Sequence, residues 1–149
     1  MSKKQTTARK LDYYSLYLLD YLRRHRFPQQ YDMYFVRQRA DEAAEIYEQE
    51  RRNGHTTDQA QEMAMSVLTK GLHNSQYDIL LGVMDTEFGK SIPDIQHEQL
   101  TERLLPFMAD IFAVYDLTTD DFTLTDGCKN LHDELTGAVA LYIRQYGIQ

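Results

Sequence analysis

Apolar residues recur along the chain at intervals of three and four, the spacing of one helix face, and not in the alternating pattern of strands. This periodicity predicts helices over about residues 10–25, 31–52, 56–70, 75–88, 100–115 and 128–146. The expected fold class is therefore all-α, a compact multihelical bundle of about six or seven helices. We expect a single helical domain over residues 1–149, in which residues 1–9 form a mobile basic tail.

Local signals mark where two of these helices begin. Thr56 and Gln59 have the spacing of a capping box, in which each side chain bonds the backbone N–H of the other residue. Asn74 or Ser75 is expected to cap the following helix, because short polar side chains accept hydrogen bonds from the first turn.

Proline and glycine predict an interruption and an end. Pro106 lies inside the periodic segment over residues 100–115, where it removes a backbone donor and clashes with the preceding turn. We therefore expect a kink or two abutting helices there. The stretch DLTTDDFTLTDG is predicted to be a loop or a short extra turn, and Gly147 is predicted to stop the last helix.

The segment LDYYSLYLLDYL places four tyrosines on one short helix. Helical spacing puts four leucines in one sector: Leu11, Leu18, Leu19 and Leu22. The tyrosines fill the adjoining sector: Tyr13, Tyr14, Tyr17 and Tyr21. A tyrosine buries its ring while its hydroxyl needs a partner or water, so it suits the rim between core and solvent. The simplest interpretation is a helix clamped by two neighbours.

An exposed tyrosine row would also suit binding, because tyrosine offers contact area at low entropic cost. The candidate interaction residues are Tyr13, Tyr17, Tyr21 and Arg24. The same row could stack nucleobases above Arg24, but Asp20 lies nearby and weakens that interpretation. We expect a protein–protein interaction module whose partner is another protein or, in a homodimer, a second copy of the chain.

The charge is negative but unevenly distributed. The 16 Lys and Arg residues and 23 Asp and Glu residues of the chain give a net charge of −7, which weighs against a general nucleic-acid binder. Residues 1–52 nevertheless carry +3 and the remainder −10. The alternative function is therefore an accessory nucleic-acid-binding protein that uses the basic first third, including Lys3, Lys4, Arg9 and Lys10.

Candidate catalytic and metal-binding chemistry is sparse. The chain's five histidines show no Glu-x-x-His spacing, and only Asp94–His97 approximates it, so we expect no metal site. No phosphate-binding loop or nucleophile elbow occurs, and we expect no cofactor. Cys128, the only cysteine, lies one turn before His132, which is a weak case for a nucleophile. We therefore expect no catalytic residue and no enzyme.

The apolar stretches are short. The basic N-terminal segment lacks the apolar run of a signal peptide, and TGAVALYI is too short to cross a bilayer. We expect a cytoplasmic protein that does not bind membranes.

Five segments together resemble a known family: LDYYSLYLLDYL, ADEAAEIYEQERRNG, TTDQAQEMAMSVLTKGLHNSQYDIL, RLLPFMADIFAVYDLTTDDF and LHDELTGAVALYIRQYG. They are similar to small uncharacterised helical proteins of the Bacteroides group of bacteria, a domain of unknown function often encountered with conjugative transposons. The resemblance covers nearly the whole chain and implies a helical fold and a bacterial setting. It implies no catalytic or ligand-binding residue.

Overall fold

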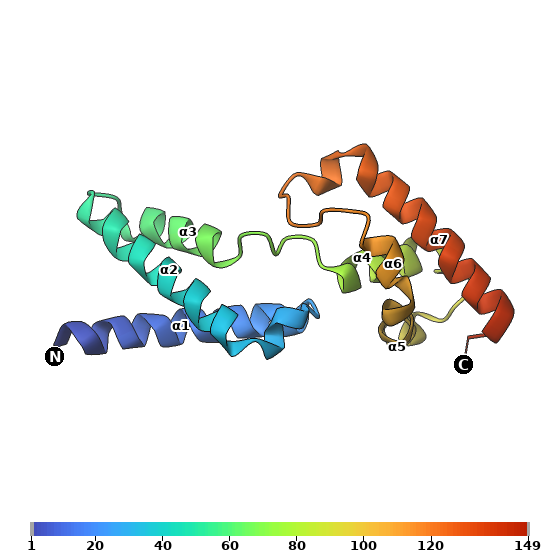
Figure 1. Cartoon of the computed structure of the whole chain (residues 1–149), viewed down its shortest axis with the longest axis horizontal. Coiled ribbons are helices and arrows are strands. Elements are labelled where there is room, and N and C mark those ends of the chain that lie inside the picture. Colours follow the sequence, from blue (N-terminus) through green and yellow to red (C-terminus); the bar gives the residue numbers. More distant parts are fainter. Residues whose placement is uncertain (1, 149) are drawn as a thin grey trace. The chain divides into compact units, whose positions relative to one another are not determined.

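The structure, a computed structural model, describes the backbone of residues 2–148 and the side chains of residues 13–148. Within these residues every regular element is a helix, seven of them α-helices and three short 3-10 helices (Figure 1). The all-α prediction is confirmed. The predicted mobile tail, residues 1–9, lies outside the residues described with side chains.

The chain divides into two compact units, residues 1–70 and 71–149. We call them the N-terminal unit and the C-terminal unit and describe each by itself. The expectation of a single domain stays a prediction.

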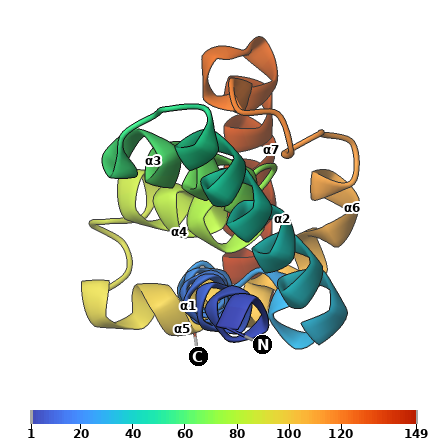
Figure 2. The same cartoon turned by 90° about the vertical axis from the view of Figure 1, so that its left-hand side faces the viewer.

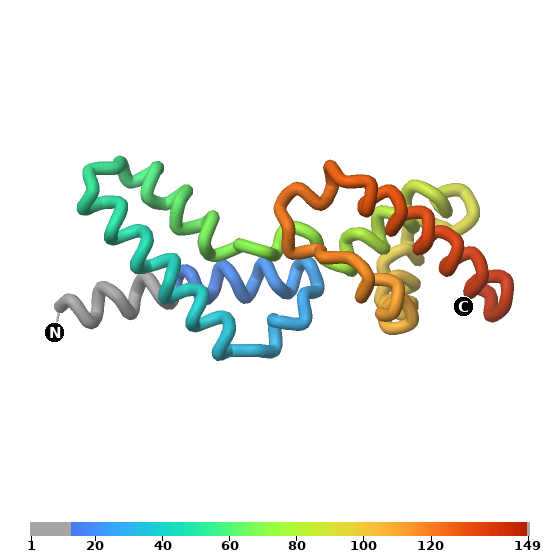
Figure 3. The backbone as a smooth tube through the Cα atoms, turned by 45° about the horizontal axis from the view of Figure 1, so that its top comes forward, coloured from blue at the N-terminus to red at the C-terminus, as the bar shows by residue number. Residues whose placement is uncertain are grey.

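The N-terminal unit contains four helices: α1 (Ser2–Arg24), the 3-10 helix η1 (Pro28–Tyr31), α2 (Met33–Arg52) and α3 (Thr57–Leu68). A turn at Gly54, where φ is +95°, reverses the chain, so that α2 and α3 run side by side in opposite directions (Figure 3). The predicted capping box is confirmed at the start of α3. Gln59 N–H donates to Thr56 Oγ1 at 3.2 Å, and Thr56 N–H donates to Gln59 Oε1 at 3.0 Å.

Small side chains make up most of the interface between α2 and α3 in the N-terminal unit. Five alanines are buried on α2 and α3: Ala40, Ala43, Ala44, Ala60 and Ala64. Because alanine has only one side-chain carbon beyond the backbone, such residues suit two helices that pack closely. Tyr14, Leu18 and Leu22 are the buried residues of α1, which packs against α2.

The C-terminal unit contains six helices: α4 (Gln76–Glu87), α5 (Asp94–Leu104), η2 (Leu105–Met108), α6 (Ala109–Phe112), η3 (Phe122–Leu124) and α7 (Asp126–Tyr146). Ser75 caps α4 by accepting a hydrogen bond from Asp78 N–H at 2.9 Å. The expectation at Pro106 is confirmed, because α5, η2 and α6 follow one another as abutting helices. Gly147, with φ +78°, ends α7 as predicted.

Large apolar side chains fill the interior of the C-terminal unit. α7 packs against α4 and α6 (Figures 1 and 2). The buried cluster between the helices contains Leu80, Val83, Met84, Ile92, Leu100, Leu104, Met108, Phe112, Phe122, Leu131, Leu135 and Val139. Asn74 holds the long loop before η3 by donating to Leu117 O at 3.1 Å and Thr119 O at 2.9 Å.

None of the described helices combines the length and the apolar character that a bilayer crossing requires.

Candidate interaction surface

Tyr14 is the tyrosine of α1 that is buried in the N-terminal unit. Its ring is 3% exposed, and its hydroxyl donates to Gln61 Oε1 on α3 at 2.7 Å. Burial raises the pKa of Tyr14 to about 12. Because α1 also packs against α2, the interpretation of a helix clamped by two neighbours describes this residue.

Three neighbouring residues of α1 are exposed instead. The exposed fraction is 52% for Tyr13, 68% for Leu16 and 37% for Tyr17. The rings of Tyr13 and Tyr17 lie 6.5 Å apart between centroids. We call Tyr13, Leu16 and Tyr17 the α1 outer face.

Leu16 is the residue of this face that the sequence reasoning missed. The predicted leucine stripe did not include Leu16, and its members Leu18 and Leu22 are buried. However, Leu16 follows Tyr13 by three residues, and residues three and four apart share a helix face. The signal for an exposed leucine was therefore present in the spacing.

The other two predicted residues lie elsewhere. Tyr21 is half-buried, with its ring 4.5 Å from that of His25 and stacked 6.3 Å from that of Phe27. Arg24 is exposed, and its Nε donates to Asp20 Oδ2 at 2.9 Å. Of the four candidates, the structure brings Tyr13 and Tyr17 together on the outer face.

Several arginines of the basic first third make contacts within the protein. Arg39 donates to three carbonyls at the end of α3: Val67 O at 3.3 Å, Leu68 O at 3.2 Å and Lys70 O at 2.7 Å. These carbonyls lie at and just beyond the C-terminal end of α3, where a cation is favoured by the helix dipole. Arg51 donates to His55 O at 2.9 Å, and Arg52 lies 3.7 Å from Glu48.

The two residues of the weak nucleophile candidate, Cys128 and His132, both lie on α7. Cys128 is a half-buried free cysteine, and His132 Nε2 lies 2.9 Å from Glu87 Oε1 on α4. Among the described residues, no group of three or more His, Cys, Asp and Glu is placed to hold a metal ion.

His97 is a buried histidine that contacts two carboxylates at the surface, Asp85 and Asp94. Asp94–His97 was noted in the sequence only as an approximation to a metal-binding spacing, and His97 Nε2 lies 3.8 Å from Asp94 Oδ1. The nearer carboxylate is Asp85 on α4, whose Oδ1 lies 2.6 Å from His97 Nδ1. The hydrogen bond to Asp85 is the main cause that raises the pKa of His97.

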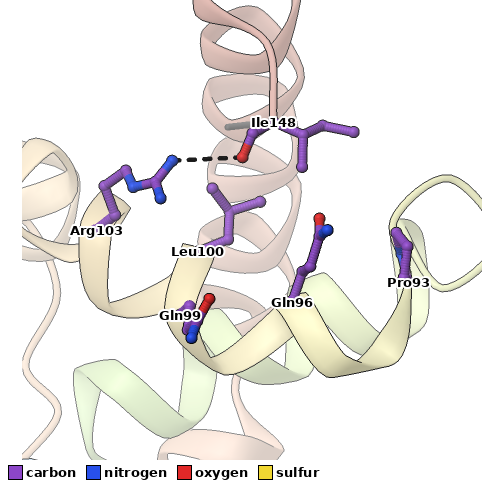
Figure 4. Close-up of a pocket in the computed structure, with 6 residues that line it drawn as sticks. All are labelled: Pro93, Gln96, Gln99, Leu100, Arg103 and Ile148. Atoms are coloured by element: carbon purple, nitrogen blue, oxygen red, sulfur yellow. Dashed lines mark hydrogen bonds between the residues drawn. The ribbon is translucent and has the colours of Figure 1, made fainter.

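A groove of about 370 Å³ lies along α5 (Figure 4). Its lining residues are Pro93, Gln96, Gln99, Leu100, Arg103 and Ile148. Arg103 Nη1 donates to Ile148 O at 3.3 Å, so the end of the described chain forms one wall.

The chain is similar to a known family and to a solved structure. The model of a family described as Domain of unknown function (DUF1896) matches residues 6–148. The crystal structure of protein PG0816 from Porphyromonas gingivalis is similar, with a TM-score of 0.86 and 34% sequence identity, over 97% of this chain and 98% of that chain. None of the curated proteins matches the chain.

Proposed function

The chain belongs to the family described as Domain of unknown function (DUF1896), and we propose that it acts as a non-enzymatic protein–protein interaction module through the α1 outer face. The observation that carries the proposal is the exposure of Tyr13, Leu16 and Tyr17 side by side on one helix. Single exposed apolar residues are common on protein surfaces, whereas grouped aromatic residues are enriched at interfaces.

The charges beside this face favour a protein as the partner. Asp20 and Arg24 follow the face by one or two turns and neutralise each other at 2.9 Å. A nucleic-acid groove would instead need cations that are available to phosphates. The contacts of Arg24, Arg39 and Arg51 within the protein count against the nucleic-acid alternative.

The non-enzymatic part of the proposal is supported by the contacts of two histidines. Both ring nitrogens of His97 face acceptors, so neither is directed at a substrate. His132 is paired with Glu87. A general base needs a nitrogen within reach of the proton that it abstracts.

The cytoplasmic setting and the association with conjugative transposons stay predictions. If the association holds, the proteins encoded beside this one are the first partners to test.

A pair of leucine substitutions tests the proposal. Leu16→Glu places a charge in the middle of the α1 outer face, and Leu124→Glu makes the same change at an 86% exposed leucine of η3. Light scattering over a concentration series measures self-association. A photo-crosslinking residue at position 17, introduced in the native host, reports a different protein partner.

We expect Leu16→Glu to abolish the dimer or the crosslinked species and Leu124→Glu to leave either unchanged. Circular dichroism should show equal helix content in both variants, because both leucines are exposed. A protein that stays monomeric, and whose crosslinks do not change with Leu16→Glu, would contradict the proposal.

A further inference from the structure

His97 lies in the first turns of α5, with its side chain buried to 3% exposure. The six-residue connection before it, residues 88–93, joins α4 to α5. His97 contacts both the helix before this connection and the connection itself. Its Nδ1 lies 2.6 Å from Asp85 Oδ1 on α4, and its Nε2 lies 2.8 Å from Ile92 O. The imidazole therefore ties the end of the connection to the preceding helix.

Both partners of the imidazole are hydrogen-bond acceptors. A carboxylate and a carbonyl oxygen have no proton to donate, and a neutral imidazole carries only one N–H. Only the doubly protonated imidazolium donates to both at once. Both contacts are hydrogen bonds at the same time only when each ring nitrogen of His97 carries a proton.

We propose that the His97–Asp85–Ile92 cluster is a pH-responsive latch that closes the α4–α5 connection when the imidazole is protonated and loosens it when the proton leaves. In the neutral form one nitrogen presents a lone pair to an oxygen at 2.6 or 2.8 Å. Two acceptors at that distance repel each other, so one of the two contacts opens.

The charges that act on His97 have the same sign. Asp85 on α4 and Asp94 on α5 both favour the imidazolium, while burial of the ring opposes it. The hydrogen bond to Asp85 outweighs burial, and the pKa of His97 is raised. The folded pKa therefore lies above the ordinary histidine value of about 6.5.

The sign of the pH effect follows from this direction. A group whose pKa is raised on closure stabilises the closed form fully below its ordinary pKa. That stabilisation is lost as pH rises through the pKa of the closed form. The latch is thus closed in mildly acidic solution and loosens as pH rises from the ordinary histidine pKa through the higher pKa of the closed form.

Backbone hydrogen bonds and close packing hold the connection between α4 and α5 in place. Ile92 N–H donates to Phe88 O at 3.0 Å, and Ser91 N–H donates to the same oxygen at 3.2 Å. Gly89 lies so close to α4 that a Cβ there would be 2.8 Å from Asp85 O.

The Ile92 side chain is in the buried cluster, and Pro93 lines the groove along α5. Loss of the contact with Ile92 O would therefore move a core side chain and one wall of the groove.

NMR on the intact protein tests the latch directly. The ¹⁵N shifts of the His97 ring give its protonation state and its pKa. Hydrogen exchange at the Ser91 and Ile92 amides, corrected for the intrinsic rate of each amide at each pH, reports closure of the connection. We expect both His97 nitrogens to be protonated at about pH 6 and the pKa to exceed the ordinary value.

Protection of the two amides should fall by about tenfold for each unit by which the His97 pKa exceeds its ordinary value. Asp85→Asn should lower the pKa of His97 and shrink this pH dependence. Glu87→Gln removes the same charge from the same helix at an exposed residue that pairs with His132, and it should change neither.

Titration of His97 at or below the ordinary value would overturn the proposal. So would protection at Ser91 and Ile92 that stays constant through the titration, or an Asp85→Asn variant that titrates like Glu87→Gln. The wild-type measurement is decisive even if a variant folds poorly.

Discussion

The two units fill their interiors with side chains of different size. The interface between α2 and α3 in the N-terminal unit is made largely of alanines, whereas the C-terminal unit buries leucines, methionines and phenylalanines. The units also differ in charge: residues 1–70 hold 12 Lys+Arg and 10 Asp+Glu, and residues 71–149 hold 4 and 13. Small side chains therefore dominate one helix interface, whereas large apolar side chains fill the interior of the other unit.

This difference implies opposite sensitivities to mutation. An interface of alanines has no large side chain to lose, but it has little space for a larger one. A core of large side chains loses most when one of them is truncated, because a cavity remains.

The largest effect is expected for truncation in the C-terminal unit. Leu135→Ala should lower the free energy of unfolding by about 2–5 kcal/mol, because Leu135 is fully buried in the cluster. Urea unfolding measures the loss. Leu141→Ala on the exposed side of the same helix is the control and should change stability by about 0.5 kcal/mol or less.

Hydrogen exchange on Leu135→Ala adds a second readout. Loss of protection confined to residues 71–149 would mean that the units unfold separately, and loss in both would support the predicted single domain. A loss of stability equal to that of Leu141→Ala would contradict the account of this core.

Enlargement in the N-terminal unit should have the next largest effect. Ala64→Leu introduces a larger side chain into a fully buried position of α3 and should cost about 1–3 kcal/mol. Thermal unfolding measures the change, and Met63→Leu at the exposed neighbouring residue is the control. A more stable Ala64→Leu variant would show that the α2–α3 interface contains unfilled space.

The contact of Arg39 with α3 should contribute less. Arg39→Met keeps an unbranched side chain beside Phe35, whose ring centroid lies 4.8 Å from the guanidinium, but removes the donors to three carbonyls. We expect the free energy of unfolding to fall by about 1–2 kcal/mol. Hydrogen bonds from a charged group are stronger than those between neutral groups, but the Arg39 side chain is partly exposed. Denaturant unfolding should show a smaller loss for Arg37→Met, an exposed arginine of the same helix.

The smallest of the four effects is expected at the start of α3. Thr56→Ala removes the side-chain half of the capping box and should cost about 1 kcal/mol. Thr57→Ala, at the first helical residue, is the matched control. Equal stability of the two variants would mean that the capping box contributes little in this protein.

The sequence was sufficient where neighbours along the chain determine the structure. The capping box at Thr56, the abutting helices around Pro106 and the end of α7 at Gly147 were all predicted correctly. Each depends on backbone groups within a few residues, so spacing alone carries the information.

The candidate surface was predicted only in part. Helical spacing grouped the tyrosines of α1, but burial of Tyr14 against Gln61 and exposure of Leu16 depend on where α2 and α3 lie. Leu16 was in neither the predicted leucine stripe nor the predicted surface, because an exposed leucine costs little by itself and residue type gives no signal for it.

The sequence established a chain of amphipathic helices, their principal ends and the uneven charge, because these follow from local sterics, hydrogen bonding and composition. Only the folded chain selected the contacts between distant residues. It placed Arg39 against carbonyls 28 to 31 residues away, and it gave His97 the carboxylate of Asp85 at 2.6 Å in preference to Asp94 at 3.8 Å. The physical reason is that such pairs depend on how whole helices pack, and many different pairings are compatible with the same helical pattern.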